Sequence, residues 1–245
     1  MFIKDSDIEK IKKFKKVAAL TGAGISAESG VPTFRGEEGL WKKFRPEELA
    51  NFDAFMQNPE LVWEWYNYRR KLILEVKPNP GHYALAELEN IIPDFTLITQ
   101  NVDDLHRKAG STSVLELHGN IMKSKCIDCG KIAESIGHIE KGELPRCECG
   151  GLLRPDVVWY GEMLPQDVLS KALRVTEHSD LFLSIGTSAV VQPAASLPVI
   201  AKRNGGFVIE INKEPTVISD TVDLFLQGKS GEILPELIEN VWQER

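Results

Sequence analysis

The four cysteines of the chain are spaced like the ligands of a metal ion. They form two short pairs, Cys126-Ile-Asp-Cys129 and Cys147-Glu-Cys149, each followed by glycine. Two such pairs are typical of a zinc ribbon, in which complete sulfur coordination leaves no open position for a reacting water. The sequence therefore predicts a structural zinc site. The alternatives are four unrelated thiols or two disulfides, which no secretory signal supports, and the C-x-C spacing is tighter than usual.

A second set of reactive or ligand-binding residues follows four apolar runs that are typical of strands. The sequence Gln-Asn-Val-Asp follows 95–99, His118 follows 114–117, Gly-Thr-Ser follows 181–185 and Asn-Lys-Glu follows 207–211. In an open parallel sheet, ligands bind beyond the carboxyl ends of the strands, so these residues are expected to share one crevice. Taken singly, each has a simpler explanation, because Asn, Asp, Gly and Ser often end strands and one histidine there is more often structural.

The first polar turn of the chain has the spacing of a dinucleotide-binding loop. Gly22, Gly24 and Ala27 satisfy the pattern G-x-G-x-x-A directly after an apolar run. A long helix normally follows such a turn, but Gly30 and Pro32 interrupt the helical pattern here. The sequence therefore predicts a phosphate-binding turn whose helix ends early.

The elements that must position these residues alternate between strand and helix. Strand-like runs lie at 17–20, 95–99, 114–117, 181–185, 207–211 and 224–226, and helical patterns at 59–76, 81–90, 166–177, 194–203 and 232–243. This alternation predicts an α/β fold with a Rossmann-like, mostly parallel sheet that carries helices on both faces. Asp5 or Ser6 is expected to cap a short N-terminal helix, and Ser230 the last helix.

Two segments do not fit the alternation and are expected to form a smaller inserted lobe. Residues 31–80 would be its helical part and residues 120–155 its zinc-ribbon part. The Rossmann-like domain would then comprise residues 1–30, 81–119 and 156–245.

The composition limits the classes of partner. The 245 residues are 42% hydrophobic and 27% charged, as in an ordinary globular protein. A net charge of −7 argues against a nucleic-acid-binding face, since phosphate contacts need clustered Lys and Arg. No apolar run approaches the roughly 20 residues of a membrane span, and the N-terminus lacks the apolar core of a signal peptide. We expect a cytoplasmic protein with no nucleic-acid or membrane partner.

Several segments of the chain together resemble the sirtuins, the NAD-consuming protein-lysine deacylases. In chain order they are GAGISAESGVPTFRG, TQNVDDLHRKAG, LHGN, the four-cysteine insert, RPDVVWYGE, GTSAVVQPAA and INKEP. These matches run from about residue 17 to residue 235, which is nearly the whole chain.

The resemblance implies that NAD is a substrate that is cleaved. The Gly-rich turn would hold the pyrophosphate on its backbone N–H groups, Phe34 would cover the reacting ribose and Arg35 would serve the phosphates. Asn101 and Asp103 would fix the nicotinamide end. The implied NAD-binding residues are Gly22, Ala23, Gly24, Ser26, Phe34, Arg35, Trp41, Gln100, Asn101, Val102, Asp103, Gly186, Thr187, Ser188, Asn212, Lys213, Glu214 and Ser230.

The same resemblance assigns the reaction chemistry to His118. The acyl oxygen of the substrate lysine would expel nicotinamide from the ribose, and His118 would then act as general base on a ribose hydroxyl. The products would be nicotinamide, free lysine and 2′-O-acyl-ADP-ribose. Substrate would bind as an added strand along Val158, Trp159, Tyr160 and Gly161.

Two features differ from many members of the family. Thr33 stands where many members have Asp, and Tyr66 and Arg69 are three residues apart on a predicted helix, so they share a face. They match the Tyr-x-x-Arg pair of the class III sirtuins, which remove succinyl and malonyl groups, and a phenol beside a guanidinium would suit a carboxylate. The alternative is that the aromatic residues are core and that Arg69 and Arg70 form a solvated edge.

Three other functions are compatible with parts of the pattern. A mono-ADP-ribosyltransferase on the same fold would break the same bond of NAD. A zinc-containing NAD oxidoreductase would need a long first helix and an acidic residue after the second strand, where Gln100 and Asn101 stand instead. A non-catalytic zinc-ribbon binding module would not need the polar strand ends.

Overall fold

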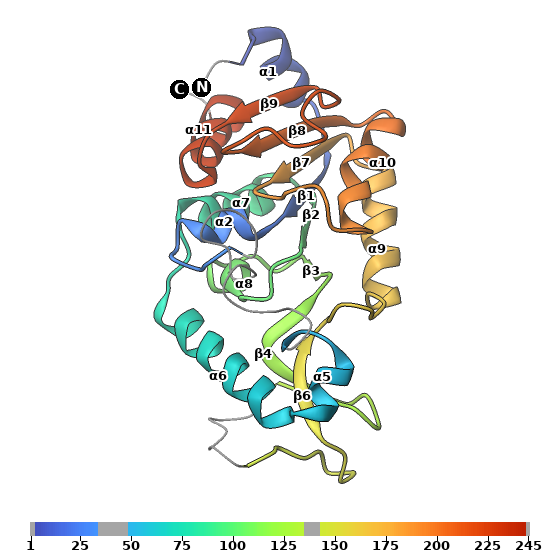
Figure 1. Ribbon diagram of the computed structural model, residues 1–245. Helices are drawn as coiled ribbons and strands as arrows, with labels where there is room; N and C mark the ends of the chain where they lie inside the picture. The colour runs from blue at the N-terminus through green and yellow to red at the C-terminus, as the bar shows by residue number, and fades with distance from the viewer. Residues whose placement is uncertain (1–2, 34–48, 135–142, 244–245) are drawn as a thin grey trace.

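The computed structural model describes residues 3–33, 49–134 and 143–243, and its largest element is a six-stranded parallel sheet (Figure 1). The strand order is β3-β2-β1-β7-β8-β9, and every neighbouring pair is parallel. The bounds are β1 Lys16–Thr21, β2 Asp94–Thr99, β3 Val114–Glu116, β7 Leu181–Ile185, β8 Phe207–Asn212 and β9 Leu224–Gln227. The predicted Rossmann-like sheet is confirmed.

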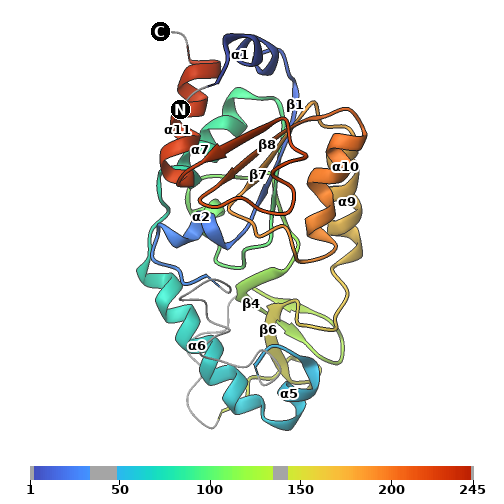
Figure 2. The same cartoon turned by 45° about the horizontal axis from the view of Figure 1, so that its top comes forward.

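Helices cover both faces of the sheet (Figure 2). On one side lie α1 (Asp5–Ile11), α7 (Pro80–Ile91) and α11 (Ser230–Trp242), and on the other lie α9 (Gln166–Glu177) and α10 (Leu197–Arg203), which the 3-10 turn η1 (Ala194–Ser196) precedes. Successive side chains of β1 alternate between the two apolar layers. Val17 and Ala19 pack with α7 and α11, whereas Ala18 and Leu20 pack with α9 and α10. Two short helices, α2 (Ala23–Ala27) and α8 (Leu105–Lys108), follow β1 and β2.

A smaller lobe lies at the opposite end of the molecule from β8 and β9 (Figure 1). It contains the antiparallel sheet β5-β4-β6, with β4 Gly119–Cys126, β5 Ile132–Ala133 and β6 Leu153–Val157, and the helices α5 (Phe52–Gln57) and α6 (Pro59–Glu75). Its apolar core includes Phe55, Trp63 and Trp159. Arg70 of α6 joins helix to sheet, because its Nε donates to the Ile121 carbonyl of β4 at 2.6 Å.

The predicted caps of the first and last helices are wrong. The N-cap residues are Lys4 and Lys229, and neither makes a side-chain capping bond. Asp5 and Ser230 are instead the first residues of their helices, one position too late to cap them. Within the described ranges, no helix combines the length and apolarity needed to cross a membrane.

Candidate active site and cysteine cluster

A cleft of about 1020 Å³ is lined both by the carboxyl edge of the parallel sheet and by the smaller lobe. Residues that follow β1, β2, β3, β7 and β8 all reach it, so the predicted convergence of the polar strand ends is confirmed. The expected site residues that line it are Gly22, Ala23, Gly24, Tyr66, Arg69, Gln100, Asn101, Val102, His118, Val158, Trp159, Tyr160, Gly161, Gly186, Thr187, Ser188, Asn212, Lys213, Glu214 and Ser230.

The Gly-rich turn lies directly against the loop after β7. Gly24 N donates to the Gly186 carbonyl at 2.8 Å, and α2 ends at Ala27, as the early break predicts. A Cβ on Gly24 would lie 2.6 Å from Gly186 Cα, and one on Gly22 would lie 2.8 Å from Gly186 O. Glycine is needed at both positions because any side chain would push the Gly-rich turn away from the loop after β7.

Hydrogen bonds tie the loops after β2, β7 and β8 to one another. Gln100 Nε2 donates to Thr187 Oγ1 at 3.0 Å, and Asn212 Nδ2 donates to the Thr187 carbonyl at 2.8 Å. Thr187, in the loop after β7, thus links the loop after β2 to the loop after β8. This arrangement orients the backbone groups along the cleft before any ligand binds.

His118 is held as a neutral imidazole with one nitrogen available. Its Nδ1 lies 2.9 Å from the Gln100 carbonyl, which can only accept, so Nδ1 carries a proton and, in the neutral ring, Nε2 carries the lone pair. Burial lowers the pKa of His118 below its ordinary value, although the hydrogen bond to Gln100 acts in the opposite direction. The His118 side chain can therefore accept a proton near neutral pH.

Gly119 sets the direction of the chain after His118. Its φ is +78°, and the first residue pair of β4 and β6 joins it to Val157. A Cβ at this position would lie 2.2 Å from the Asp156 carbonyl oxygen. Only glycine combines this backbone angle with so close an approach of the neighbouring strand.

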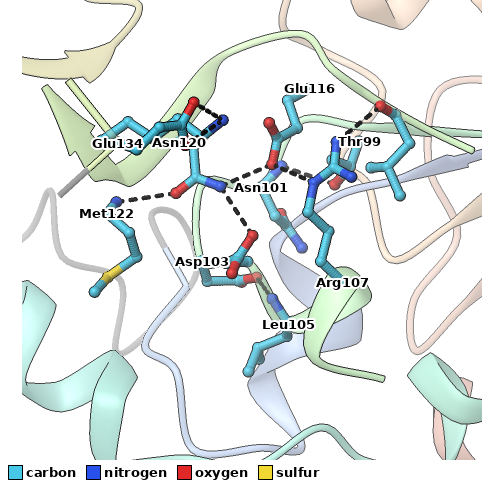
Figure 3. Close-up of polar contacts among 12 residues, drawn as sticks. Thr99, Asn101, Asp103, Leu105, Arg107, Glu116, Asn120, Met122 and Glu134 are labelled. Carbon is cyan, nitrogen blue, oxygen red and sulfur yellow. Dashed lines mark hydrogen bonds and ion pairs between the residues drawn. The ribbon is translucent and has the colours of Figure 1, made fainter. Parts of the chain in front are cut away.

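Asn120 joins the segment after His118 to the loop after β2 (Figure 3). Its Nδ2 donates to Glu116 Oε1 at 2.8 Å and to Asp104 Oδ1 at 3.0 Å, and the residue is 2% exposed. Asp104 adopts a φ of +62°, which a non-glycine residue rarely keeps without such support. The loop that carries Gln100 and the segment that carries His118 are therefore braced together.

Ser26 and Asp103 lie beneath the cleft and do not line it. Asn101 donates from Nδ2 to Ser26 Oγ at 3.1 Å and to the Gly22 carbonyl at 3.0 Å. Asp103 is 4% exposed and accepts from Leu105 N at 3.0 Å. Burial raises the pKa of Asp103, while its hydrogen bond with Ser26 acts to lower it. Ser26 therefore supports Asn101 directly, and Asp103 supports it through Ser26. The sequence pattern could not distinguish this support from direct contact with a ligand.

The expected residues Phe34, Arg35 and Trp41 lie outside the described ranges.

Tyr66 and Arg69 lie side by side on α6 and line the cleft. The Arg69 guanidinium is 5.8 Å from the Tyr66 ring centroid and 4.8 Å from that of Trp65, and the residue is only 6% exposed. Burial lowers the pKa of Arg69, against the opposing effects of Tyr66 and Asp103. Trp63, Trp65 and Tyr66 of α6 do form core, whereas Tyr68 is exposed. Arg69 and Arg70 are both buried, so the alternative of a solvated arginine edge is wrong.

The four cysteines form one cluster, separate from the cleft. Their Sγ atoms all lie within 4.8 Å of one another, with Cys126–Cys149 at 3.5 Å and Cys129–Cys147 at 3.7 Å. A tetrahedral Zn–S bond of about 2.3 Å implies S–S distances of about 3.8 Å, so the cluster fits zinc. A disulfide would need about 2.0 Å. None of the four lines the cleft, which agrees with a structural role.

Several cleft residues were not among the expected site residues: Glu28, Val191, Gln192, Pro215, Thr216 and Val217. Four of them lie within the segments quoted for the family resemblance, and Thr216 and Val217 directly follow the segment INKEP. Thr216 is held by Glu210, a fully buried carboxylate in β8 that accepts from Thr216 Oγ1 at 2.6 Å and from Ser219 Oγ at 2.5 Å. One charged residue in an otherwise apolar strand run was the signal that could have revealed this support.

The comparisons with known proteins agree with this geometry. A model of the Sir2 family matches residues 22–193. The NAD-dependent protein deacylase of Pyrococcus furiosus is 54% identical over 242 residues, covering 96% of this chain and 97% of the relative. A solved Sir2 homologue–NAD complex is 50% identical with a TM-score of 0.90, covering 98% of this chain and 94% of the other.

A structure of Sir2 with a p53 peptide and NAD+ is 33% identical and superimposes with a TM-score of 0.84, covering 97% of this chain and 98% of the other. The family match spans more than half of the chain, and the identities extend over nearly all of it. The chain belongs to the Sir2 family, the family of the sirtuins.

Proposed function

We propose that the protein is an NAD-dependent protein-lysine deacylase that transfers the acyl group to ADP-ribose. The observation that carries the proposal is His118, a neutral imidazole with its Nε2 lone pair available, in a cleft shared with the Gly-rich turn and three polar strand ends. The relatives named NAD-dependent protein deacylase support the same activity. No observation favours the ADP-ribosyltransferase or the oxidoreductase.

NAD would bind across the carboxyl edge of the sheet as a substrate. The turn at 22–24 would hold the pyrophosphate, with Gly186, Thr187 and Ser188 at the phosphate and ribose. Residues 212–214 and Ser230 would contact the adenosine. Asn101, braced by Ser26, would fix the nicotinamide end. The fixed hydrogen bonds among these loops support this orientation, because prearranged donors cost little reorganisation on binding.

The reaction would proceed in two stages. The acyl oxygen of the substrate lysine attacks C1′ of the nicotinamide ribose, and nicotinamide leaves with the electron pair of the C–N bond. Nε2 of His118 then takes the proton of a ribose hydroxyl, whose oxygen attacks the resulting imidate carbon. Water completes the release of lysine and 2′-O-acyl-ADP-ribose. The low pKa that burial gives His118 supports its role as proton acceptor.

Tyr66 and Arg69 would select acyl groups that end in a carboxylate, such as succinyl and malonyl, in addition to acetyl. Arg69 is a buried cation that lines the cleft beside a buried phenol. A carboxylate that enters such a site loses its water and regains stability only from charged or hydrogen-bonding partners. Both side chains project from one helix face, which supports simultaneous contact with one chain end.

The peptide would lie as an added strand along residues 158–161. Tyr160 is 51% exposed at this edge, and main-chain pairing is a common mode of peptide recognition. The Sir2–p53 peptide complex among the structural neighbours supports a peptide substrate. Zinc would be held by the four cysteines and would stabilise the smaller lobe without taking part in the reaction.

The proposal is tested by incubating the protein with NAD and one peptide that carries acetyl-, malonyl- or succinyl-lysine, with the products identified by mass. We expect nicotinamide, free lysine peptide and 2′-O-acyl-ADP-ribose in equal amounts. A peptide that gains ADP-ribose would instead indicate the transferase. Reduced NAD without nicotinamide release would indicate an oxidoreductase, and either result would overturn the proposal.

A further inference from the structure

The side chain of Trp159 makes a buried hydrogen bond to Tyr66. Its Nε1 lies 2.8 Å from the Tyr66 hydroxyl oxygen, and the two residues are 2% and 1% exposed. An indole N–H can only donate, so the tyrosine oxygen is the acceptor. The proton of the Tyr66 hydroxyl must therefore point to another acceptor, and none is found for it among the described residues.

Trp159 is itself held from several directions. Its backbone N donates to Glu162 Oε2 at 2.8 Å, and the Arg154 guanidinium lies 3.7 Å from the Trp159 ring centroid. Arg154 in turn forms a two-point ion pair with Glu162, with Nη2–Oε2 at 2.8 Å. The Phe55 ring packs 5.5 Å from the Trp159 ring. The indole therefore cannot easily rotate away from Tyr66.

The Tyr66 hydroxyl keeps its proton in this position. Burial raises the pKa of Tyr66 above its ordinary value, although nearby Arg69 acts to lower it. Tyr66 and Trp159 both line the cleft, and so does Arg69. With its oxygen engaged by the indole, the hydroxyl is a donor toward the cleft. The hydrogen bond that the Tyr66 oxygen accepts from the indole also polarises the O–H group, which makes the hydroxyl a stronger donor.

We infer that Trp159 is a positioning residue for acyl selection: its indole N–H commits the Tyr66 hydroxyl to donate, and so favours acyl chains that end in a hydrogen-bond acceptor. The inference rests on the proposed selection of acidic acyl groups by Tyr66 and Arg69. It gives the Trp159 side chain a role distinct from the peptide strand proposed along residues 158–161. The residue that borders the peptide strand also orients the recognition of the acyl end.

The test measures kcat and KM for succinyl- and acetyl-lysine versions of one peptide at saturating NAD. The variants are Trp159→Phe, Tyr66→Phe and the double variant. We expect each single variant to lower the succinyl-to-acetyl ratio of kcat/KM by about three- to tenfold, as for one hydrogen bond. The double variant should fall no further than Tyr66→Phe alone, because the indole acts through the hydroxyl.

The change should appear mainly as a higher KM for the succinyl peptide, since the chain end binds alike in ground and transition states. A merely structural role would lower kcat on both peptides. Trp63→Phe is the matched control, because Trp63 is equally buried and its Nε1 donates to the Leu153 carbonyl at 3.1 Å, away from Tyr66. Its succinyl-to-acetyl ratio should stay at the wild-type value.

If Trp159→Phe does not fold, benzothienylalanine at position 159 keeps the ring shape and removes only the N–H. A lower ratio in Tyr66→Phe with an unchanged ratio in the Trp159 variant would overturn the inference alone. So would effects that multiply in the double variant. A wild-type protein that does not act on the succinyl peptide would overturn both the inference and the proposed acyl selection.

Discussion

Replacing Gly119 by alanine should disable the site while leaving NAD-binding residues untouched. The new Cβ would lie 2.2 Å from the Asp156 carbonyl oxygen, whereas an ordinary contact needs at least 3.4 Å. The His118 segment must therefore move away from β6 by about 1 Å, and a displacement of that size typically costs about 100-fold in rate. We expect kcat/KM for an acetyl peptide to fall about 100-fold, which corresponds to about 2.7 kcal/mol.

The control separates this displacement from the cost of the backbone angle. Gly205 has a φ of +90°, and a Cβ there would meet nothing within 4 Å. Both substitutions force alanine into the left-handed region, which costs about 1–2 kcal/mol of stability. Gly205→Ala should therefore lower Tm slightly and leave kcat/KM at the wild-type value.

The assay is deacetylation at saturating NAD, with Tm from thermal unfolding of the same samples. Gly119→Ala should show the larger Tm loss, because its clash also disturbs the pairing of β4 with β6. A folded Gly119→Ala protein whose kcat/KM stays within about twofold of that of the Gly205→Ala protein would refute the reasoning. Such a result would mean that the displacement of His118 raises the activation free energy by less than about 0.4 kcal/mol.

Three other perturbations test the remaining parts of the site. His118→Ala should lower kcat/KM by about 10²- to 10⁴-fold with NAD affinity retained by calorimetry, and near-normal turnover would exclude it as the base. Because burial lowers the pKa of His118, wild-type kcat/KM should stay level as pH falls from 8 and should decline only below the ordinary imidazole value of about 6.5; a midpoint above that value would contradict the assigned protonation state. Arg69→Met should lower the succinyl-to-acetyl ratio of kcat/KM by about 10- to 100-fold, and an unchanged ratio would mean that Arg69 only packs the helix. Replacing any one of the clustered cysteines by serine should reduce bound zinc and Tm together; the four positions are Cys126, Cys129, Cys147 and Cys149. Full zinc content by metal analysis in all four variants would argue against the cluster as the zinc site.

The parallel sheet was predictable because its strands are continuous apolar runs. The expected strand at 181–185 coincides with β7, whose residues are all fully buried. The polar residues that end the strands reach one cleft for a geometric reason, since parallel strands present their carboxyl ends at one edge. The apolar pattern is a property of each single segment, and the topology follows from the order of strands and helices along the chain. Both can therefore be read directly from the sequence.

Details that depend on packing between distant segments were not predictable. The pattern did not separate Asn101, which lines the cleft, from Asp103, which lies beneath it two residues later. The hydrogen bond from Trp159 to Tyr66 joins residues 93 positions apart, and no local signal marks it. The predicted caps of α1 and α11 were wrong because the N-cap position depends on where the chain enters the helix, and the preceding loop decides this.

The strand order also governs the time course of chain folding. β1 lies at the centre of the sheet, yet its two neighbours are made at very different stages of synthesis, because Val17 pairs with Phe95 on one side and with Leu181 on the other. The half with β1, β2 and β3 can assemble first, whereas one edge of β1 stays open until β7 emerges. Such distant pairings slow folding and expose unpaired strand edges meanwhile. Until β7 is made, the edge of β1 that pairs with it would present unpaired backbone N–H and C=O groups, and chaperone protection would matter most at this stage.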